Sequence, residues 1–279
     1  MSAEKNSWVK DLLVAFAATT LSIILTFGTT GVINRVKQKQ ERKLTALMVM
    51  SSIEKFARQL DVIAEDLAHK DSLATWLLSI PVEEVAEWED FLMDPLTEAA
   101  GDFIILTRDK SADAIFSSSI DTWKNLGVFA FIENVGCAFS EMDELMNDYN
   151  ESMNDFGAMV EDITFHPDDY PGSSKAEKFL RNDALKQHFR NKYKNLETYL
   201  SLASADLRRR NRNNMRFIGI SEKEVMAFTD NLGAADEYEA DDLMPNDYRR
   251  PTPDVDSLAV KLSYARQLDS LRQVKNAGK

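Results

Sequence analysis

The sequence predicts an all-α protein: a single N-terminal transmembrane helix that continues into a helical-bundle domain. Three observations carry this prediction. Residues 12–34 contain no charged side chain. In most of the following chain, apolar residues recur every three or four positions, which is the spacing of one helix face. No segment keeps the strict alternation of polar and apolar residues that is typical of a strand.

The uncharged window, LLVAFAATTLSIILTFGTTGVIN, follows a short tail, residues 1–11. At about 1.5 Å per residue, a helix of this length crosses the roughly 30 Å hydrocarbon core of a bilayer. The alternatives are a cleaved signal peptide, with Lys5 and Lys10 as its basic region, and a buried helix of a soluble protein. The stretch exceeds the usual signal-peptide core of about 7–15 residues, and no small-x-small cleavage site precedes Arg35. An uncleaved membrane anchor is therefore the favoured interpretation.

Basic residues on the two sides of the window predict its orientation. Only Lys5 and Lys10 precede it, whereas five basic residues follow: Arg35, Lys37, Lys39, Arg42 and Lys43. Lys and Arg favour the cytoplasmic side, which predicts that the larger part of the chain is cytoplasmic. Cys137 is the only cysteine, so an intrachain disulfide cannot decide between the two sides.

Small and hydroxyl-bearing residues share one face of the predicted span. They are Ala15, Thr19, Ser22, Thr26 and Thr29, while Phe16, Ile23 and Phe27 lie toward another face. Such residues let membrane helices approach closely and hydrogen-bond to one another, which predicts a helix-packing face. The alternative is that each hydroxyl bonds a carbonyl of its own helix, one turn back. No ionisable residue lies in the window, so an ion pathway has no support.

The bundle domain is predicted over residues 35–237. The first helix continues through Leu44, Leu47, Met48, Ile53, Phe56, Leu60, Ile63 and Leu67. Pro81 is expected to open a second helix that ends near Pro95. The run 103–106 fits either a strand or a buried helix, and a helix through Ile115, Ile120 and Trp123 is expected to end at Gly127.

The longest amphipathic stripe of the bundle domain follows that glycine. It comprises Val135, Phe139, Met142, Leu145, Tyr149, Met153, Phe156, Val160 and Ile163. Ser174 with Glu177 forms a capping box, which predicts a helix from there to about Arg216. Its apolar side carries Phe179, Phe189, Tyr193, Leu196, Leu200, Ala203 and Leu207.

A second capping box and a final helix complete the expected elements. Ser221 with Glu224 repeats the capping signature, and Gly233 supplies a helix stop. Residues 238–256, acidic and containing three prolines, are interpreted as a linker. Residues 257–279 are predicted to form an amphipathic helix with Leu258, Leu262, Ala265, Leu268 and Leu271 on one side.

Charge is segregated between the two longest helices of the domain. Residues 125–174 contain eleven acidic residues and no Lys or Arg, whereas residues 175–216 contain twelve Lys and Arg and four acids. This pattern predicts that the two helices pack antiparallel, with charged flanks that attract one another. Each exposed pair contributes about 0.2–1 kcal/mol, so the charges determine helix pairing more than overall stability.

Catalytic and metal-binding patterns are not evident in the sequence, and neither an enzyme nor a cofactor is expected. An acidic stripe, Glu141, Glu144, Asp148, Glu151 and Asp155, lacks the Glu-x-x-His pairs of di-iron bundles and is interpreted as a solvated face or the mate of the basic helix. His166, Asp168 and Asp169 share a loop that could hold a divalent cation, but it is read more simply as a turn. No phosphate-binding loop, nucleophile elbow or zinc spacing is present in the sequence.

One concentrated basic patch lies near the end of the predicted helix 174–216. It comprises Arg208, Arg209, Arg210, Arg212 and Arg216. At a helix C-terminus these cations suit the macrodipole. On the cytoplasmic side they could also contact anionic lipid or a partner, at roughly 1 kcal/mol per basic residue near the surface. Nucleic acid is not expected as a partner, because the net charge of −13 repels a polyanion.

The segment SIDTWKNLGVFAFIENVGCAFSEMDELMNDY, together with the preceding membrane helix, resembles a group of uncharacterised bacterial single-pass membrane proteins. The shared positions are Gly127, the apolar turn 129–132, Asn134 and Tyr149. This resemblance covers about half of the chain and implies a bacterial inner-membrane protein with a helical domain, without any catalytic residue. Members of that group tend to have more basic N-termini, which would place the domain outside the cytoplasm; this sequence departs from that pattern.

The expected function is that of a membrane-anchored, non-enzymatic helical protein that acts as an assembly or scaffold component. Its expected partners are the lipid bilayer and either a second copy of the chain or another membrane protein. The alternative is a membrane-tethered sensory or regulatory module that binds a small ligand or peptide, with Trp88 and Trp123 as pocket residues.

Overall fold

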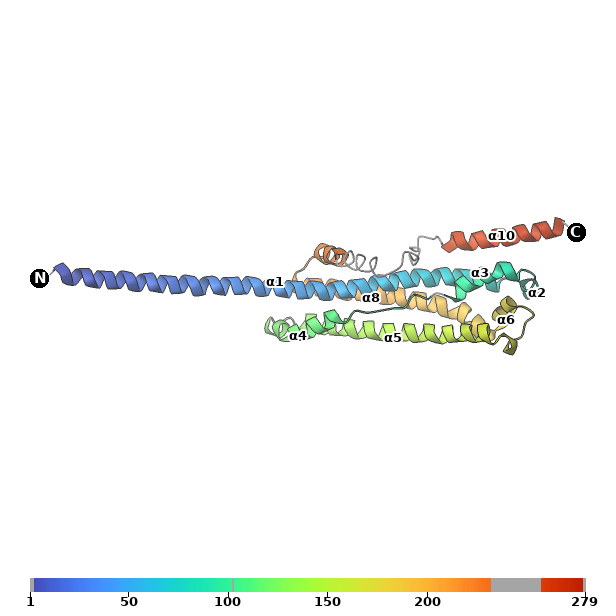
Figure 1. Ribbon diagram of the computed structural model, residues 1–279, viewed down its shortest axis with the longest axis horizontal. Coiled ribbons are helices and arrows are strands. Elements are labelled where there is room, and N and C mark those ends of the chain that lie inside the picture. The colour runs from blue at the N-terminus through green and yellow to red at the C-terminus, as the bar shows by residue number, and fades with distance from the viewer. Residues whose placement is uncertain (1–2, 102, 232–256, 278–279) are drawn as a thin grey trace. The chain divides into compact units, whose positions relative to one another are not determined.

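The computed structural model describes residues 3–101, 103–231 and 257–277, with side chains described for residues 36–101, 103–231 and 261–277 (Figure 1). Every regular element assigned in these ranges is helical, which confirms the all-α prediction. The chain divides into two units, residues 1–48 and residues 49–279. Helix α1 (Ala3–Leu78) provides residues to both.

The predicted span, residues 12–34, falls in the helical backbone of α1, but its side chains lie outside the described residues. The same holds for the predicted packing face Ala15, Thr19, Ser22, Thr26 and Thr29. In the part of the chain with described side chains, no helix combines the length and the apolar character needed to cross a membrane.

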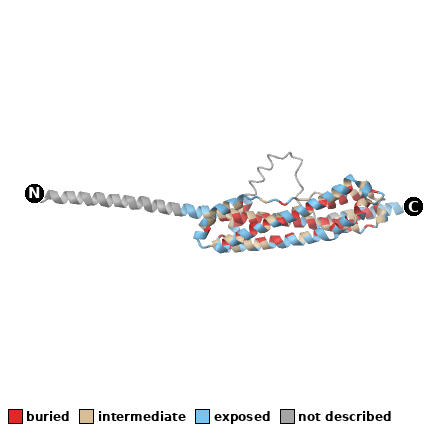
Figure 2. Ribbon diagram, turned by 90° about the horizontal axis from the view of Figure 1, so that it is seen from below, coloured by how far each residue is buried: buried red, intermediate tan, exposed pale blue. Residues whose placement is uncertain are grey.

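Three long helices form the core of the second unit: α1 from Val49 onward, α5 (Phe129–Phe165) and α8 (Tyr193–Ile218). Hydrogen bonds join Met50 to Asn211 and Ala57 to Ser204, so α8 runs antiparallel to α1. Asn134 bonds Asn214, and Ser152 bonds Lys192, so α8 is antiparallel to α5 as well (Figure 1). Buried residues line the sides of these helices that face one another (Figure 2).

Apolar periodicity predicts most of the buried positions, although Leu44, expected on the apolar side of α1, is 50% exposed. Of the nine apolar positions expected along α5, all except Val160 are buried. In α1, Ile53, Leu60 and Ile63 are completely buried. The buried side chains of this unit therefore follow the helical spacing read from the sequence.

The predicted end of the second helix near Pro95 is wrong. After Pro81 the chain forms a short helix α2 (Val82–Val85), and then α3 (Glu89–Ala100), which contains Pro95 in its interior. Pro95 is buried, as are Leu96 and Ala99 after it. Tertiary packing of this apolar turn outweighs the hydrogen bond that proline cannot donate.

Residues 103–106 form neither the strand nor the helix that their apolar character allowed, and residues 103–110 contain no regular element. They lie extended along α5, and α5 side chains supply their hydrogen bonds. Asn150 accepts from the Leu106 amide (3.1 Å) and donates to the Leu106 carbonyl (2.9 Å), while the Tyr149 hydroxyl donates to Ile104 (3.0 Å). Helix α4 (Ser111–Asn125) follows, and Gly127 closes it with a left-handed φ of 71°, as expected of a glycine helix stop.

The predicted single helix from Ser174 to Arg216 is interrupted. A 3₁₀ turn, η1 (Pro167–Asp169), precedes α6 (Lys175–Arg181), α7 (Asp183–Gln187) and a π-helical turn, η2 (His188–Lys192). Asn182 adopts an extended backbone, and its side chain caps α7 by accepting from the Leu185 amide. The capping interaction of Ser174 with the Glu177 amide forms as predicted, although the Glu177 carboxylate bonds Ser173 instead of Ser174.

The last two elements begin where the sequence predicts. Ser221 and Glu224 cap a helix over residues 222–231, each accepting from the other's amide. Helix α10 (Ser257–Ala277) matches the predicted C-terminal amphipathic helix. The expected glycine stop at Gly233 and the linker 238–256 lie outside the described residues.

Candidate functional site

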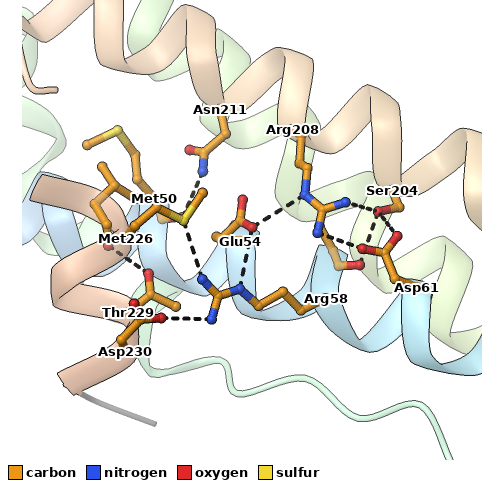
Figure 3. Close-up of polar contacts among 12 residues, drawn as sticks. Met50, Glu54, Arg58, Asp61, Ser204, Arg208, Asn211, Met226, Thr229 and Asp230 are labelled. Carbon is orange, nitrogen blue, oxygen red and sulfur yellow. Dashed lines mark hydrogen bonds and ion pairs between the residues drawn. The ribbon is translucent and has the colours of Figure 1, made fainter. Parts of the chain in front are cut away.

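A group of polar and charged residues joins three helices of the second unit, and we call it the polar seam (Figure 3). Its members are Met50, Glu54, Arg58 and Asp61 on α1, Ser204, Arg208 and Asn211 on α8, and Met226 and Asp230 on the helix 222–231. More than 140 positions in the sequence separate the members on α1 from all the others, so the seam exists only in the folded bundle.

Glu54 is the charged centre of the polar seam. Its side chain is 4% exposed and lies between two guanidinium groups, 3.3 Å from Arg208 and 3.5 Å from Arg58. Arg58 lies one helical turn after Glu54, at the i,i+4 spacing at which opposite charges attract on a helix. A buried carboxylate is costly unless it is paired and hydrogen-bonded, and here two opposite charges compensate it.

Both arginines continue to a further carboxylate. Arg208 contacts Asp61 at 2.6 Å, and this hydrogen bond raises the pKa of Arg208. Arg58 donates to Asp230 (2.9 Å) and to the sulfur of Met226 (3.3 Å). The alternating chain of charges thus fastens the helix 222–231 and α8 to the same two turns of α1.

Neutral hydrogen bonds fix the register of α1 against α8. Asn211 donates to the Met50 carbonyl (2.9 Å). The hydroxyl of Ser204 lies 2.6 Å from Asp61 and 3.1 Å from the Ala57 carbonyl. Both residues are 1% exposed, so a shift of α8 along α1 would leave their buried polar groups without partners.

The chemistry of the polar seam is that of a clamp. Glu54 is held between the guanidinium groups of Arg58 and Arg208, so its carboxylate is engaged in ion pairs on both sides. Buried polar groups of this kind specify one helix register over others. We therefore take the polar seam as the site at which the bundle holds α1.

The five arginines of the predicted basic patch have different partners in the structure. Arg208 belongs to the polar seam, Arg210 lies 3.0 Å from Glu141 of α5, and Arg209 pairs with Asp206 on its own helix. Arg212 and Arg216 are exposed, and no ion pair joins them to another residue in the described part of the chain. Of the five arginines, these two are therefore the exposed members that no ion pair engages in the described part of the chain.

The antiparallel pairing expected from charge segregation is confirmed, and among the described residues one ion pair joins α5 to α8. Glu141 pairs with Arg210, and burial raises the pKa of Glu141 despite this cation. Asn134 adds hydrogen bonds to Asn214 (2.7 Å) and to the Arg210 carbonyl (2.9 Å). The other four members of the acidic stripe, Glu144, Asp148, Glu151 and Asp155, are exposed, as expected of a solvated face.

Arg108 was not singled out by sequence reasoning, yet its side chain is only 1% exposed. It pairs with Asp113 and with Asp143 of α5 (2.6 Å), and it donates to the Phe139 carbonyl (2.9 Å). Its guanidinium also lies 4.8 Å from the centre of the Phe139 ring. Arg108 thereby fastens the extended segment 103–110 to α5.

An aromatic cluster fills the far end of the bundle, at the π-helical turn. Phe156 of α5 stacks on His188 at 3.7 Å between ring centres, and Phe103, Phe189 and Tyr193 surround the pair. His188 is 4% exposed, and its Nε2 has no hydrogen-bond partner among the described residues. Burial, together with the charge of Lys192, lowers the pKa of His188 from 6.5 to about 3.

This histidine predicts a loss of stability in acid. The unfolded chain takes up the proton near pH 6.5 and the folded chain only near pH 3, so stability is complete above pH 6.5 and falls as the pH drops between these values. The fall is about 1.4 kcal/mol per pH unit. In urea unfolding at several pH values, His188→Phe is expected to flatten the acid slope, and His166→Gln, at an exposed histidine, to leave it unchanged. Equal slopes for the native chain and His188→Phe would show that His188 is protonated in the folded bundle.

Helix α10 docks on an acidic and aromatic surface of the α1 end, α2 and α3, which we call the α10 surface. Tyr264 stacks on Trp76 (5.9 Å), contacts the edge of Phe91 and donates to Glu98 (3.1 Å). Further along α10, Arg272 pairs with Glu84 at 2.6 Å, and Lys275 pairs with Glu87 and lies over the Trp88 ring. The apolar side predicted for this helix is only partly covered, since Leu268 is 2% exposed but Leu262 is 41% exposed.

The remaining candidates from the sequence are ordinary polar contacts. His69 lies 2.7 Å from Glu98, and His166 pairs with Asp162 of the preceding turn. Asp168 lies 3.7 Å from Lys178, and no group of three or more metal-ligating side chains occurs in the described ranges. Trp123 is buried among Phe131 and Ser119, whereas Trp88 is half-buried beneath Lys275. No protein-family model, curated protein or solved structure matches the chain.

Proposed function

We propose that this protein is a membrane-anchored helical scaffold, in which residues 12–34 of α1 span the bilayer and the bundle serves as an assembly module. The observation that carries the proposal is the continuity of α1: one helix, Ala3–Leu78, contains the uncharged window and also supplies the core residues held by the polar seam.

The assembly role is supported by the small and hydroxyl-bearing face of the window. Such faces drive association of helices in lipid by close packing and interhelical hydrogen bonds. We propose that Ala15, Thr19, Ser22, Thr26 and Thr29 meet the same face of a second copy or of another membrane protein.

Disulfide crosslinking in native membranes tests this role. In a Cys137→Ser background, single cysteines at Thr19, Ser22 and Thr26 are expected to crosslink severalfold more efficiently than cysteines at Phe16, Ile23 and Phe27. The Phe and Ile positions are the matched controls, because they share the depth of the hydroxyl positions but face elsewhere. Equal yields at all six positions would contradict a specific packing face.

We place the bundle on the cytoplasmic side of a bacterial inner membrane, because five basic residues follow the window and only two precede it. Protease added to intact spheroplasts is then expected to leave a C-terminal tag intact until the cells are lysed. Digestion before lysis would reverse this orientation.

A second candidate function, a membrane-tethered regulatory module that binds a peptide, is favoured by the α10 surface. This surface holds a basic amphipathic helix by two ion pairs and an aromatic stack, so it selects peptides of that chemistry. A peptide that displaces α10 would release Tyr264, Arg272 and Lys275 from the α10 surface. Hydrogen exchange measures whether α10 is displaced. If the amides of residues 257–277 stay equally protected when basic amphipathic peptides are added, this function is contradicted.

A further inference from the structure

We infer that the bundle end formed by the α4–α5 turn and the C-terminus of α8 is a contact surface for an anionic lipid bilayer. We call this surface the bundle-end patch; it comprises Leu126, Phe129, Arg212, Arg216 and Phe217. The inference deepens the proposed function, on which it rests, by giving the bundle a contact with the membrane beyond the span itself.

Two helix ends meet at the bundle-end patch. Asn134 of α5 bonds Asn214 of α8, which places the start of α5 beside the end of α8. Phe129 lies five residues before Asn134, and Phe217 lies three residues after Asn214. At about 1.5 Å of rise per residue, the two aromatic residues differ in height along the bundle by only about 3 Å.

The apolar members of the patch are exposed. Phe129 is 62% exposed, Leu126 is 48% exposed and Phe217 is 45% exposed. Single exposed apolar residues are ordinary, but three at one end of a bundle are typical of an interaction site. Transfer of such side chains from water into the bilayer interface is favourable, as in amphipathic helices that lie on membranes.

The cations of the patch select an anionic surface. Arg212 and Arg216 are exposed, and no ion pair joins either of them to a carboxylate in the described part of the chain. At the helix ends that form the patch, the exposed charges of Lys124 and Asp121 and of Lys223 and Glu222 balance, and Glu133 adds one negative charge. The local balance is therefore positive in a chain whose net charge is −13. Each basic residue near an anionic leaflet contributes roughly 1 kcal/mol to binding.

Chain length favours this end of the bundle over the other. Met50 bonds Asn211, so the bundle portion of α1 begins at the end that carries the patch. Only the 14 residues 35–48 separate the proposed span from that portion. The opposite end, at Leu78, lies 30 residues further along the sequence than Met48.

Fluorescence quenching by spin-labelled lipid tests the inference on the full chain. The protein, with Cys137→Ser and one cysteine at Phe129 or Phe217, is labelled with a small fluorophore and placed in nanodiscs that contain phosphatidylglycerol and headgroup-nitroxide lipid. Quenching at positions 129 and 217 is expected to be at least twofold greater than at Phe165→Cys. Phe165 is the matched control, because it is 73% exposed at the opposite end of α5.

Charge reversal supplies the second measurement. Arg212→Glu with Arg216→Glu is expected to reduce quenching at position 129 to the level at position 165, without loss of helicity, because neither arginine holds the fold together. Quenching at 129 and 217 that does not exceed the level at 165 would overturn the inference and leave the anchor intact. Labels that are shielded from aqueous iodide but not quenched by lipid would indicate a second protein copy instead and also overturn it. If the chain did not enter nanodiscs, the proposed membrane anchor and this inference would both be contradicted.

Discussion

Phe156→Ala is expected to lower the free energy of unfolding by about 4 kcal/mol, because it removes the centre of a buried aromatic cluster. Phe156 is 1% exposed and contacts His188, Phe103 and Tyr193 at ring-centre distances of 3.7, 5.3 and 5.9 Å. Four aromatic neighbours that hold one another in place cannot collapse readily into the space that the ring leaves.

Urea unfolding of the detergent-solubilised chain, followed by circular dichroism, measures this loss. Phe165→Ala on the same helix is the control; Phe165 is 73% exposed, and its replacement is expected to change the stability by less than about 0.5 kcal/mol. Phe156→Leu should lie between the two. Equal effects at positions 156 and 165 would mean that the cluster does not form the core of this end of the bundle.

Arg208→Met is expected to destabilise the bundle by about 2–3 kcal/mol through the polar seam. The substitution leaves Glu54, with its 4% exposed side chain, dependent on Arg58 alone, and it removes the partner of Asp61. Breaking a buried pair by removal of one member costs about 3–5 kcal/mol, and the 30% exposure of Arg208 places the effect below that range.

The adjacent arginine is the control for this effect. Arg209 has a 68% exposed side chain and pairs only with Asp206 on its own helix, so Arg209→Met is expected to cost about 0.5 kcal/mol or less. The double variant Glu54→Met with Arg208→Met should recover part of the loss, because no unpaired buried charge remains. If Arg208→Met and Arg209→Met reduced the unfolding midpoint equally, the polar seam would not fix α1.

Local signals in the sequence predict the helices and several of their ends. The apolar stripe of α5 is buried as its spacing indicates, and Ser174, Ser221 and Gly127 act at helix ends as their residue types suggest. The Glu54–Arg58 pair also forms, because both residues lie one turn apart on the same helix. Each of these features depends on residues close together in the chain.

Features that depend on distant residues escape such reasoning. Arg208 was read as one member of a surface patch, since nothing near it in the sequence indicates that Glu54 and Asp61 lie opposite. The burial of Arg108 and the extended path of residues 103–110 depend on side chains of α5 some 30–45 positions away. The helix through Pro95 persists because its neighbours are buried, which is again a property of the fold and not of the local sequence.

Membrane integration through residues 12–34 is the central claim, and alkaline carbonate extraction of bacterial membranes tests it most directly. The native chain is expected to stay in the membrane pellet. The variant with Ile23→Lys and Leu25→Lys is expected to appear in the supernatant, because each lysine near the middle of a span costs about 2.5–3.5 kcal/mol. If the native chain appears in the supernatant to the same extent as the lysine variant, the membrane anchor and the scaffold function that depends on it would both be contradicted.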